Sequence, residues 1–164
     1  MTDENDLKKL VEKLHPIAID KVLIRVGSDA DGGYVVPNDL DGMEAMFSPG
    51  VGGKLDFDME CAKKGMKVYM ADASVEGPLQ NHSNFNFTKK YIGAVNNHEF
   101  MSIEKWVDSA ELSQDSDLML QMDIEGYEYE AIYSIPDAIM KRFRVIIIEF
   151  HQMDMLFNNT YFEK

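Results

Sequence analysis

Short apolar runs alternate with amphipathic stretches from residue 44 onward, and this alternation limits the possible folds more than any other feature. The runs have the length of strands and are "EAMFS" (44–48), "KVYMAD" (67–72), "KKYIGAV" (89–95), "LMLQMD" (118–123) and "RVIIIEF" (144–150). Helical patterns lie between them at 54–65, 102–110 and 127–142, the last interrupted by Pro136. The alternation predicts an α/β fold with a mainly parallel sheet covered on both faces. Continuous apolar stretches such as "VIII" further predict strands that are buried on both sides.

The first 43 residues form a leading segment with its own pattern. Leu7, Leu10, Val11 and Leu14 repeat at helical spacing, which predicts a short helix over 5–14 that ends before Pro16. "KVLIRVG" (21–27) is typical of an extended segment, and "DADGGYVVP" (29–37) of a turn followed by a strand. We therefore expect one domain, with a leading segment over 1–43 and a ligand-binding core over 44–164.

Composition excludes several classes of partner and site. The formal net charge of −13 repels phosphate backbones, so nucleic acids and anionic membranes are poor partners. Cys61 is the single cysteine, which rules out an internal disulfide and is typical of a reducing compartment. The charged N-terminus lacks a signal-like apolar core, and no run has the length of a membrane span. These features predict a soluble, cytoplasmic protein.

A glycine-rich loop follows the first predicted strand of the core. Gly50 and Gly52 allow a ligand to approach the backbone, next to the free N–H groups of the following helix. Asp72 stands twenty residues after Gly52, at the end of the next strand, where a carboxylate can accept both hydroxyls of a ribose. The third glycine of a dinucleotide fingerprint is replaced by Leu55, and Gly53 comes early instead. The pattern therefore disfavours a nicotinamide cofactor and leaves S-adenosylmethionine (SAM) open, while a tight turn without a ligand is the alternative.

Several motifs resemble those of FkbM-type SAM-dependent methyltransferases. The stretch "LMLQMDIEGYEYEAI" (118–132) is similar to their strand-four motif, and the stretch over 46–72 resembles their first SAM motif with its acid. "IRVGSDADGGYVVP", "MSIEKWVD" and "RVIIIEFH" are similar to further elements, so that the resemblance covers roughly residues 22 to 153. It implies a three-layer Rossmann-like fold and methylation of a hydroxyl oxygen, often on a sugar or a secondary metabolite.

The resemblance also implies roles for individual residues. Gly50, Gly52 and Gly53 would line the methionine part of SAM, and Asp72 would hold its ribose. The region around Asn96 would lie near the adenine. Ser48, which is followed by Pro49, replaces the more usual acidic or small residue before the first glycine, and we count Ser48 among the expected cofactor-binding residues.

Three further residues are candidates for the chemistry at the acceptor. Asp123 and Glu125 follow the fourth strand two residues apart, so both face the same side of an extended backbone, and His151 follows the fifth. A carboxylate or a histidine there can remove the proton of an acceptor hydroxyl. The three could also bind a hard divalent cation, although no metal is predicted. Alternatively, Glu125 caps the following helix and His151 pairs with Glu149.

The resemblance also predicts how the sheet ends. The family order of strands is 3-2-1-4-5, which places the run 144–150 at one margin, and the two further strands of the family have no counterpart before Lys164. An open apolar edge there predicts a homodimer through that strand. We expect an O-methyltransferase that acts on a sugar or small molecule. The alternatives are a SAM- or nucleotide-binding module without catalysis, a methyltransferase fragment and a nicotinamide oxidoreductase.

Overall fold

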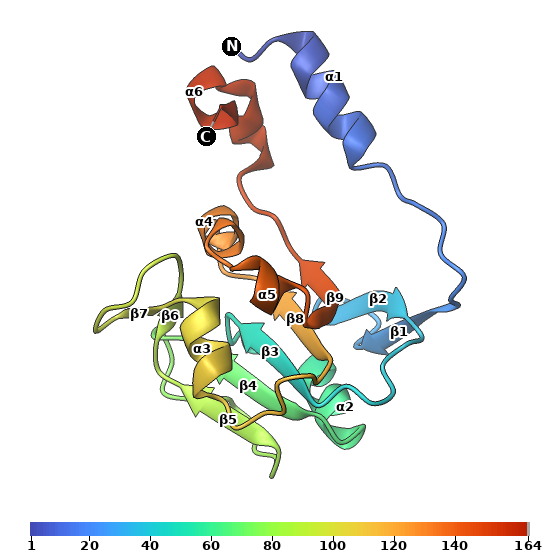
Figure 1. Cartoon of the computed structure of the whole chain (residues 1–164), viewed down its shortest axis with the longest axis vertical. Coiled ribbons are helices and arrows are strands. Elements are labelled where there is room, and N and C mark those ends of the chain that lie inside the picture. Colours follow the sequence, from blue (N-terminus) through green and yellow to red (C-terminus); the bar gives the residue numbers. More distant parts are fainter. Residues whose placement is uncertain (164) are drawn as a thin grey trace.

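The computed structural model describes residues 1–163, and a five-stranded parallel sheet forms its centre (Figure 1). From one edge to the other, its strands are β5 (Phe85–Thr88), β4 (Lys67–Ala71), β3 (Ala45–Pro49), β8 (Leu118–Met122) and β9 (Phe143–Ile148). All neighbouring strands run parallel. The predicted α/β class is therefore confirmed, as is the predicted order of the four strands β4, β3, β8 and β9.

The third sheet strand lies earlier in the chain than the sequence pattern predicts. β5 directly precedes the predicted strand over 89–95 and pairs Phe85 with Val68 and Phe87 with Met70. The predicted strand over 89–95 forms only the two-residue β6 (Tyr91–Ile92), which pairs with β7 (Phe100–Met101) outside the main sheet. The cause is packing, because Phe85 and Phe87 contact the core from alternate positions of β5.

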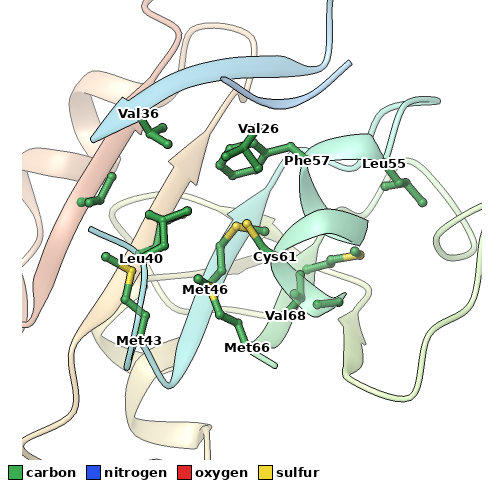
Figure 2. Packing of buried hydrophobic residues seen from close by; sticks show 14 of the residues in the cluster. Val26, Val36, Leu40, Met43, Met46, Leu55, Phe57, Cys61, Met66 and Val68 are labelled. Carbon is green, nitrogen blue, oxygen red and sulfur yellow. The ribbon is translucent and has the colours of Figure 1, made fainter. Parts of the chain in front are cut away.

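One face of the sheet is covered by helix α2 (Asp56–Lys63) and by an antiparallel hairpin of β1 (Leu23–Gly27) and β2 (Gly33–Pro37). Figure 2 shows Val26 and Val36 of the hairpin and Phe57 of α2 in one apolar cluster with Met46 of β3. The hairpin and α2 agree with the extended and helical segments predicted for these residues. This cluster fixes the hairpin beside the loop that follows β3.

The other face is covered by α3 (Ile103–Ser109), α4 (Glu128–Tyr133) and α5 (Asp137–Met140). Trp106 packs edge-to-face against Phe47 at a ring-centroid distance of 5.0 Å. The Ser102 hydroxyl caps α3 by accepting the N–H of Lys105. Pro136 separates α4 from α5, as predicted for the interrupted helix over 127–142.

Strand β9 is not buried on both sides, and the prediction made from "VIII" is wrong for this strand. Val145 is buried, whereas Arg144 is exposed and Ile146 is 40% exposed. The reason is the position of β9 at the margin of the sheet, where one face lacks full cover. All residues of β3 and β8, in the centre, are buried.

The two ends of the chain lie together at one end of the molecule (Figure 1). Helix α1 (Glu4–Lys13) stands beside the terminal elements η1 (Met153–Phe157) and α6 (Asn159–Phe162). The N–H and the hydroxyl of Thr2 donate to the carbonyls of Phe157 and Leu156 at 2.9 and 2.6 Å. Within residues 1–163, helices with the length and apolarity needed to cross a bilayer are absent.

Candidate functional site

The carboxyl ends of β3 and β8 meet at Gly50. Its φ is +87°, and a Cβ at this position would lie 1.8 Å from the carbonyl oxygen of Asp123. The N–H of Gly50 also donates to the carbonyl of Ala71 at 3.0 Å, which ties the loop to the end of β4. Glycine is therefore required at position 50 by both conformation and space.

Gly52 and Gly53 differ from Gly50, because a Cβ at either would meet nothing within 4 Å. Both residues are exposed and line open space beside the loop. The absence of side chains at these two positions therefore leaves room at the surface where a ligand can approach the backbone.

Asp72 follows β4 and organises the glycine loop. Its Oδ2 accepts the N–H of Val51 at 3.0 Å. Its Oδ1 accepts the N–H and the hydroxyl of Ser74 at 2.7 and 2.6 Å. Because a carboxylate oxygen can accept two hydrogen bonds, Oδ2 keeps capacity for one more donor.

Three cavities share Gly50 and Asp123 and surround the carboxyl ends of the strands. We name them by their walls. The aromatic cavity, of about 430 Å³, is lined by Asp72, Tyr91, Ile92, Phe100 and Tyr127 among others. The loop cavity, of about 680 Å³, lies between the glycine loop and residues 72–79, and the hairpin cavity, of about 320 Å³, lies between the glycine loop, α2 and β2.

His151 joins the predicted acidic residues at this edge. Its Nε2 lies 3.7 Å from Asp123 Oδ1 and 3.6 Å from Glu125 Oε2. Its Nδ1 lies 3.0 Å from Oε1 of Glu128. The three residues predicted from the ends of two strands therefore lie together, and a third carboxylate, that of Glu128, which was not predicted, holds the histidine.

Glu128 is fully buried and is the structural partner of this group. It accepts the N–H of Ile124 at 3.0 Å and the N–H of Gly126 at 3.0 Å, in addition to its contact with His151. Burial opposes its ionisation, but these hydrogen bonds outweigh it and hold the pKa of Glu128 below its ordinary value.

The alternative role proposed for Glu125, acceptance of backbone N–H groups before α4, belongs to Glu128 instead. Glu125 is 86% exposed at its side chain and has a φ of +56°. Likewise, His151 pairs with Glu128 rather than with Glu149. The only available sequence signal was the position of Glu128 three residues after Glu125, at the start of a helix.

The electrostatics of the group follow from this crowding of acids. Burial opposes protonation of His151, but its hydrogen bond to Glu128 and the nearby charges raise the pKa of His151 above its ordinary value. Burial, together with the charge of Glu149, raises the pKa of Asp123 against the opposing effect of His151. A carboxylate with a raised pKa is a stronger base than an ordinary one, which suits proton removal.

Asp123, Glu125 and His151 also offer a possible donor set for a cation. One ligand atom from each lies within 4.8 Å of the others. Two carboxylate oxygens and an imidazole nitrogen suit a divalent ion, and the carboxylate of Glu128 on Nδ1 would leave Nε2 free to coordinate. This geometry keeps the metal alternative open beside the role as a base.

The remaining predicted residues have different surroundings. Ser48 is buried, lines the hairpin cavity and donates to Oε1 of Gln121 at 2.9 Å. Asn96 accepts the N–H of Ser102 at 2.9 Å and donates to its hydroxyl at 3.1 Å, so its amide fixes the start of α3. It does not belong to the residues that line the three cavities.

No protein-family model, curated protein or solved structure matches this chain.

Proposed function

We propose that this chain is a SAM-dependent methyltransferase that methylates a hydroxyl of a sugar or other small molecule. The observation that carries the proposal is the convergence of the glycine loop, Asp72, Asp123 and His151 on one edge of the sheet, around three cavities that share Gly50 and Asp123. The parallel sheet with its 3-2-1-4-5 order supports the Rossmann-like methyltransferase fold that the motifs imply.

The aromatic cavity suits the adenosine half of the cofactor. It combines apolar and aromatic walls with the carboxylate of Asp72. One ribose hydroxyl can donate to the remaining lone pair of Asp72 Oδ2, and the second can replace the Ser74 hydroxyl on Oδ1. The glycine loop, which lines all three cavities through Gly50, would hold the rest of the molecule.

Asp123 and His151 would act on the acceptor. When bound, SAM supplies a methyl group that is already activated by its sulfonium. The chain therefore has to align the acceptor hydroxyl and take up its proton. Asp123, with its raised pKa, accepts that proton, and a protonated His151, with Nε2 3.7 Å from Asp123 Oδ1, stabilises the Asp123 carboxylate electrostatically.

Binding and turnover assays test this proposal in sequence. Isothermal titration with S-adenosylhomocysteine and with NAD separates the two cofactor classes. Asp72→Asn should weaken binding of S-adenosylhomocysteine by about 1.5–3 kcal/mol, the cost of losing a charge-assisted hydrogen bond. Asp115→Asn, a matched change at the opposite end of the sheet, should leave it unchanged. Equal affinity of the folded Asp72 variant and the wild type would exclude Asp72 as the ribose residue.

Turnover of methyl-labelled SAM on a library of hydroxyl compounds tests the enzymatic activity. Asp123→Asn and His151→Ala should abolish turnover while the affinity for S-adenosylhomocysteine changes little. A variant that lost this affinity but kept its rate would reverse the assigned roles. If a chelator stopped turnover and Mg²⁺ restored it, Asp123, Glu125 and His151 would be metal ligands. Binding without turnover on any compound would favour a non-catalytic module.

A further inference from the structure

The hairpin cavity has a polar lining that the proposed methyl transfer does not use. Its walls include Tyr34 of the hairpin, Ser48 of β3, Asp58 of α2 and Gln121 of β8. Asp72, the expected ribose residue, lines the other two cavities but not this one. The hairpin cavity is therefore the space that remains for an acceptor, and it reaches the proposed base, Asp123.

Asp58 is the most unusual residue of this wall. It is only 6% exposed, and its Oδ1 is enclosed without a hydrogen-bond partner. Burial raises the pKa of Asp58, because the carboxylate loses the solvation that stabilises its charge, and the nearby Ser48 hydroxyl opposes this shift only in part. An unpartnered buried carboxylate is costly, and a donor that enters the cavity would relieve that cost.

A second residue of the same cavity wall, Asp123, also has a carboxylate oxygen without a partner. Asp123 Oδ1 is enclosed, and its nearest cation, His151 Nε2, is 3.7 Å away, beyond hydrogen-bond distance. Within residues 1–163, the enclosed side-chain atoms without partners number three, and two of them are these oxygens. Their grouping around one cavity indicates a site for a group that donates hydrogen bonds.

The remaining polar groups of the cavity do not supply that donor. Ser48 donates to Gln121 Oε1, and Gln121 Nε2 donates to the Tyr34 hydroxyl at 3.2 Å. Lys54, the cation among the lining residues, pairs with Asp31 at 3.0 Å. The cavity therefore presents the carboxyl groups of Asp58 and Asp123 to an incoming donor, with its own cation engaged at the rim.

We propose that the hairpin cavity binds an ammonium group of the acceptor, with Asp58 and Asp123 as its hydrogen-bond acceptors. The acceptor would then be a small amino alcohol or amino sugar that carries both an amine and the hydroxyl to be methylated. A volume of about 320 Å³ is at the small end of ligand sites, which suits a single ring-sized group. This assignment of the substrate class rests on the proposed function.

Matched pairs of probes test the ammonium preference directly. Glucosamine is compared with glucose, galactosamine with galactose and ethanolamine with ethylene glycol, with and without S-adenosylhomocysteine, by chemical-shift titration. At least one amine should bind about 10- to 100-fold more tightly than its neutral partner, the range expected for a charge-assisted hydrogen bond. Asp58→Asn should reduce that ratio to within about twofold. Asp56→Asn, which removes an exposed acid from the same helix, should preserve it.

The possible outcomes separate this proposal from its alternatives. If the wild-type protein binds the amine and the neutral compound equally in every pair, the proposal is overturned. This result does not depend on whether Asp58→Asn folds. If Asp56→Asn reduced the preference for the amine as much as Asp58→Asn, the proposal would also be overturned, because general charge attraction would then explain the preference. A further variant of the test uses an analogue of S-adenosylhomocysteine in which hydrogen replaces the amino group. If Asp58→Asn weakened the binding of S-adenosylhomocysteine but not that of this analogue, the cavity would hold the cofactor, and the acceptor assignment would be wrong. Failure to bind S-adenosylhomocysteine at all would contradict the proposed function, whereas the amine ratios measured without it would still decide the cation site.

Discussion

Replacement of Glu128 should destabilise the protein far more than replacement of the neighbouring Glu125. Glu128 is fully buried and accepts two backbone N–H groups and the Nδ1 of His151, each at 3.0 Å from its nearest oxygen. In Glu128→Gln, the new NH₂ group faces donors, and the charge that holds His151 is lost. Removing one member of a buried hydrogen-bonded ion pair costs about 3–5 kcal/mol. For a chain of this size, the loss lowers the melting temperature by roughly 6–20 °C.

Urea denaturation and thermal melting measure this effect, and Glu125→Gln is the matched control. The Glu125 side chain is 86% exposed, so its replacement should change the free energy of unfolding by less than about 0.5 kcal/mol. NMR titration of the His151 ring gives an independent readout. The pKa of His151, raised in the wild type, should fall towards its ordinary value in Glu128→Gln.

The difference in the free energy of unfolding between the wild type and Glu128→Gln should depend on pH, because the pKa values of Glu128 and His151 are both shifted. A lowered pKa of Glu128 contributes stability above its unfolded value, and this contribution is lost as the pH falls through the folded value. A raised pKa of His151 contributes stability below its unfolded value, and this contribution is lost as the pH rises through the folded value. The loss of stability in Glu128→Gln relative to the wild type should therefore be largest between about pH 4.5 and 6.5. A variant within 1 kcal/mol of the wild type, with an unchanged His151 titration, would refute the reasoning.

Three further predictions concern the loop, the core and the sheet edge. Gly50→Ala should lower the free energy of unfolding, measured by urea titration, by at least about 2–3 kcal/mol, because the new Cβ would lie 1.8 Å from a carbonyl oxygen on a residue with positive φ. Gly53→Ala, the control, should change it by less than about 1 kcal/mol. Burial raises the pKa of Cys61 to about 12, so its thiol should not react with Ellman's reagent at pH 8 until urea unfolds the chain; prompt reaction of the folded protein would contradict this burial. The margin strand β9, with Ile146 exposed, should pair with a second copy, and light scattering that gives a monomer at micromolar concentration would rule out that dimer.

Much of the scaffold was predictable because its signals are local. Apolar runs and helical spacing predicted the parallel sheet and most of the helices, and the family resemblance implied the order of four of its strands. Residues that directly follow strands in a parallel sheet meet at one edge, so Asp123, Glu125 and His151 could be grouped before their distances were known. The sequence analysis missed β5, because the four residues "FNFT" follow the polar stretch "NHSN" and form a strand only where β4 provides a partner.

By itself, the sequence determined the order of elements and which side chains stand at the ends of strands, since both depend on neighbours along the chain. Only the tertiary structure decided which of these side chains pair. Glu128 and His151 are 23 residues apart and meet because β8 and β9 are neighbours in the sheet. Asp58 becomes an unpartnered carboxylate only when the hairpin and β3 cover α2. Burial and hydrogen bonding between distant segments depend on the register and packing of whole elements, and the periodicity of the sequence does not encode them residue by residue.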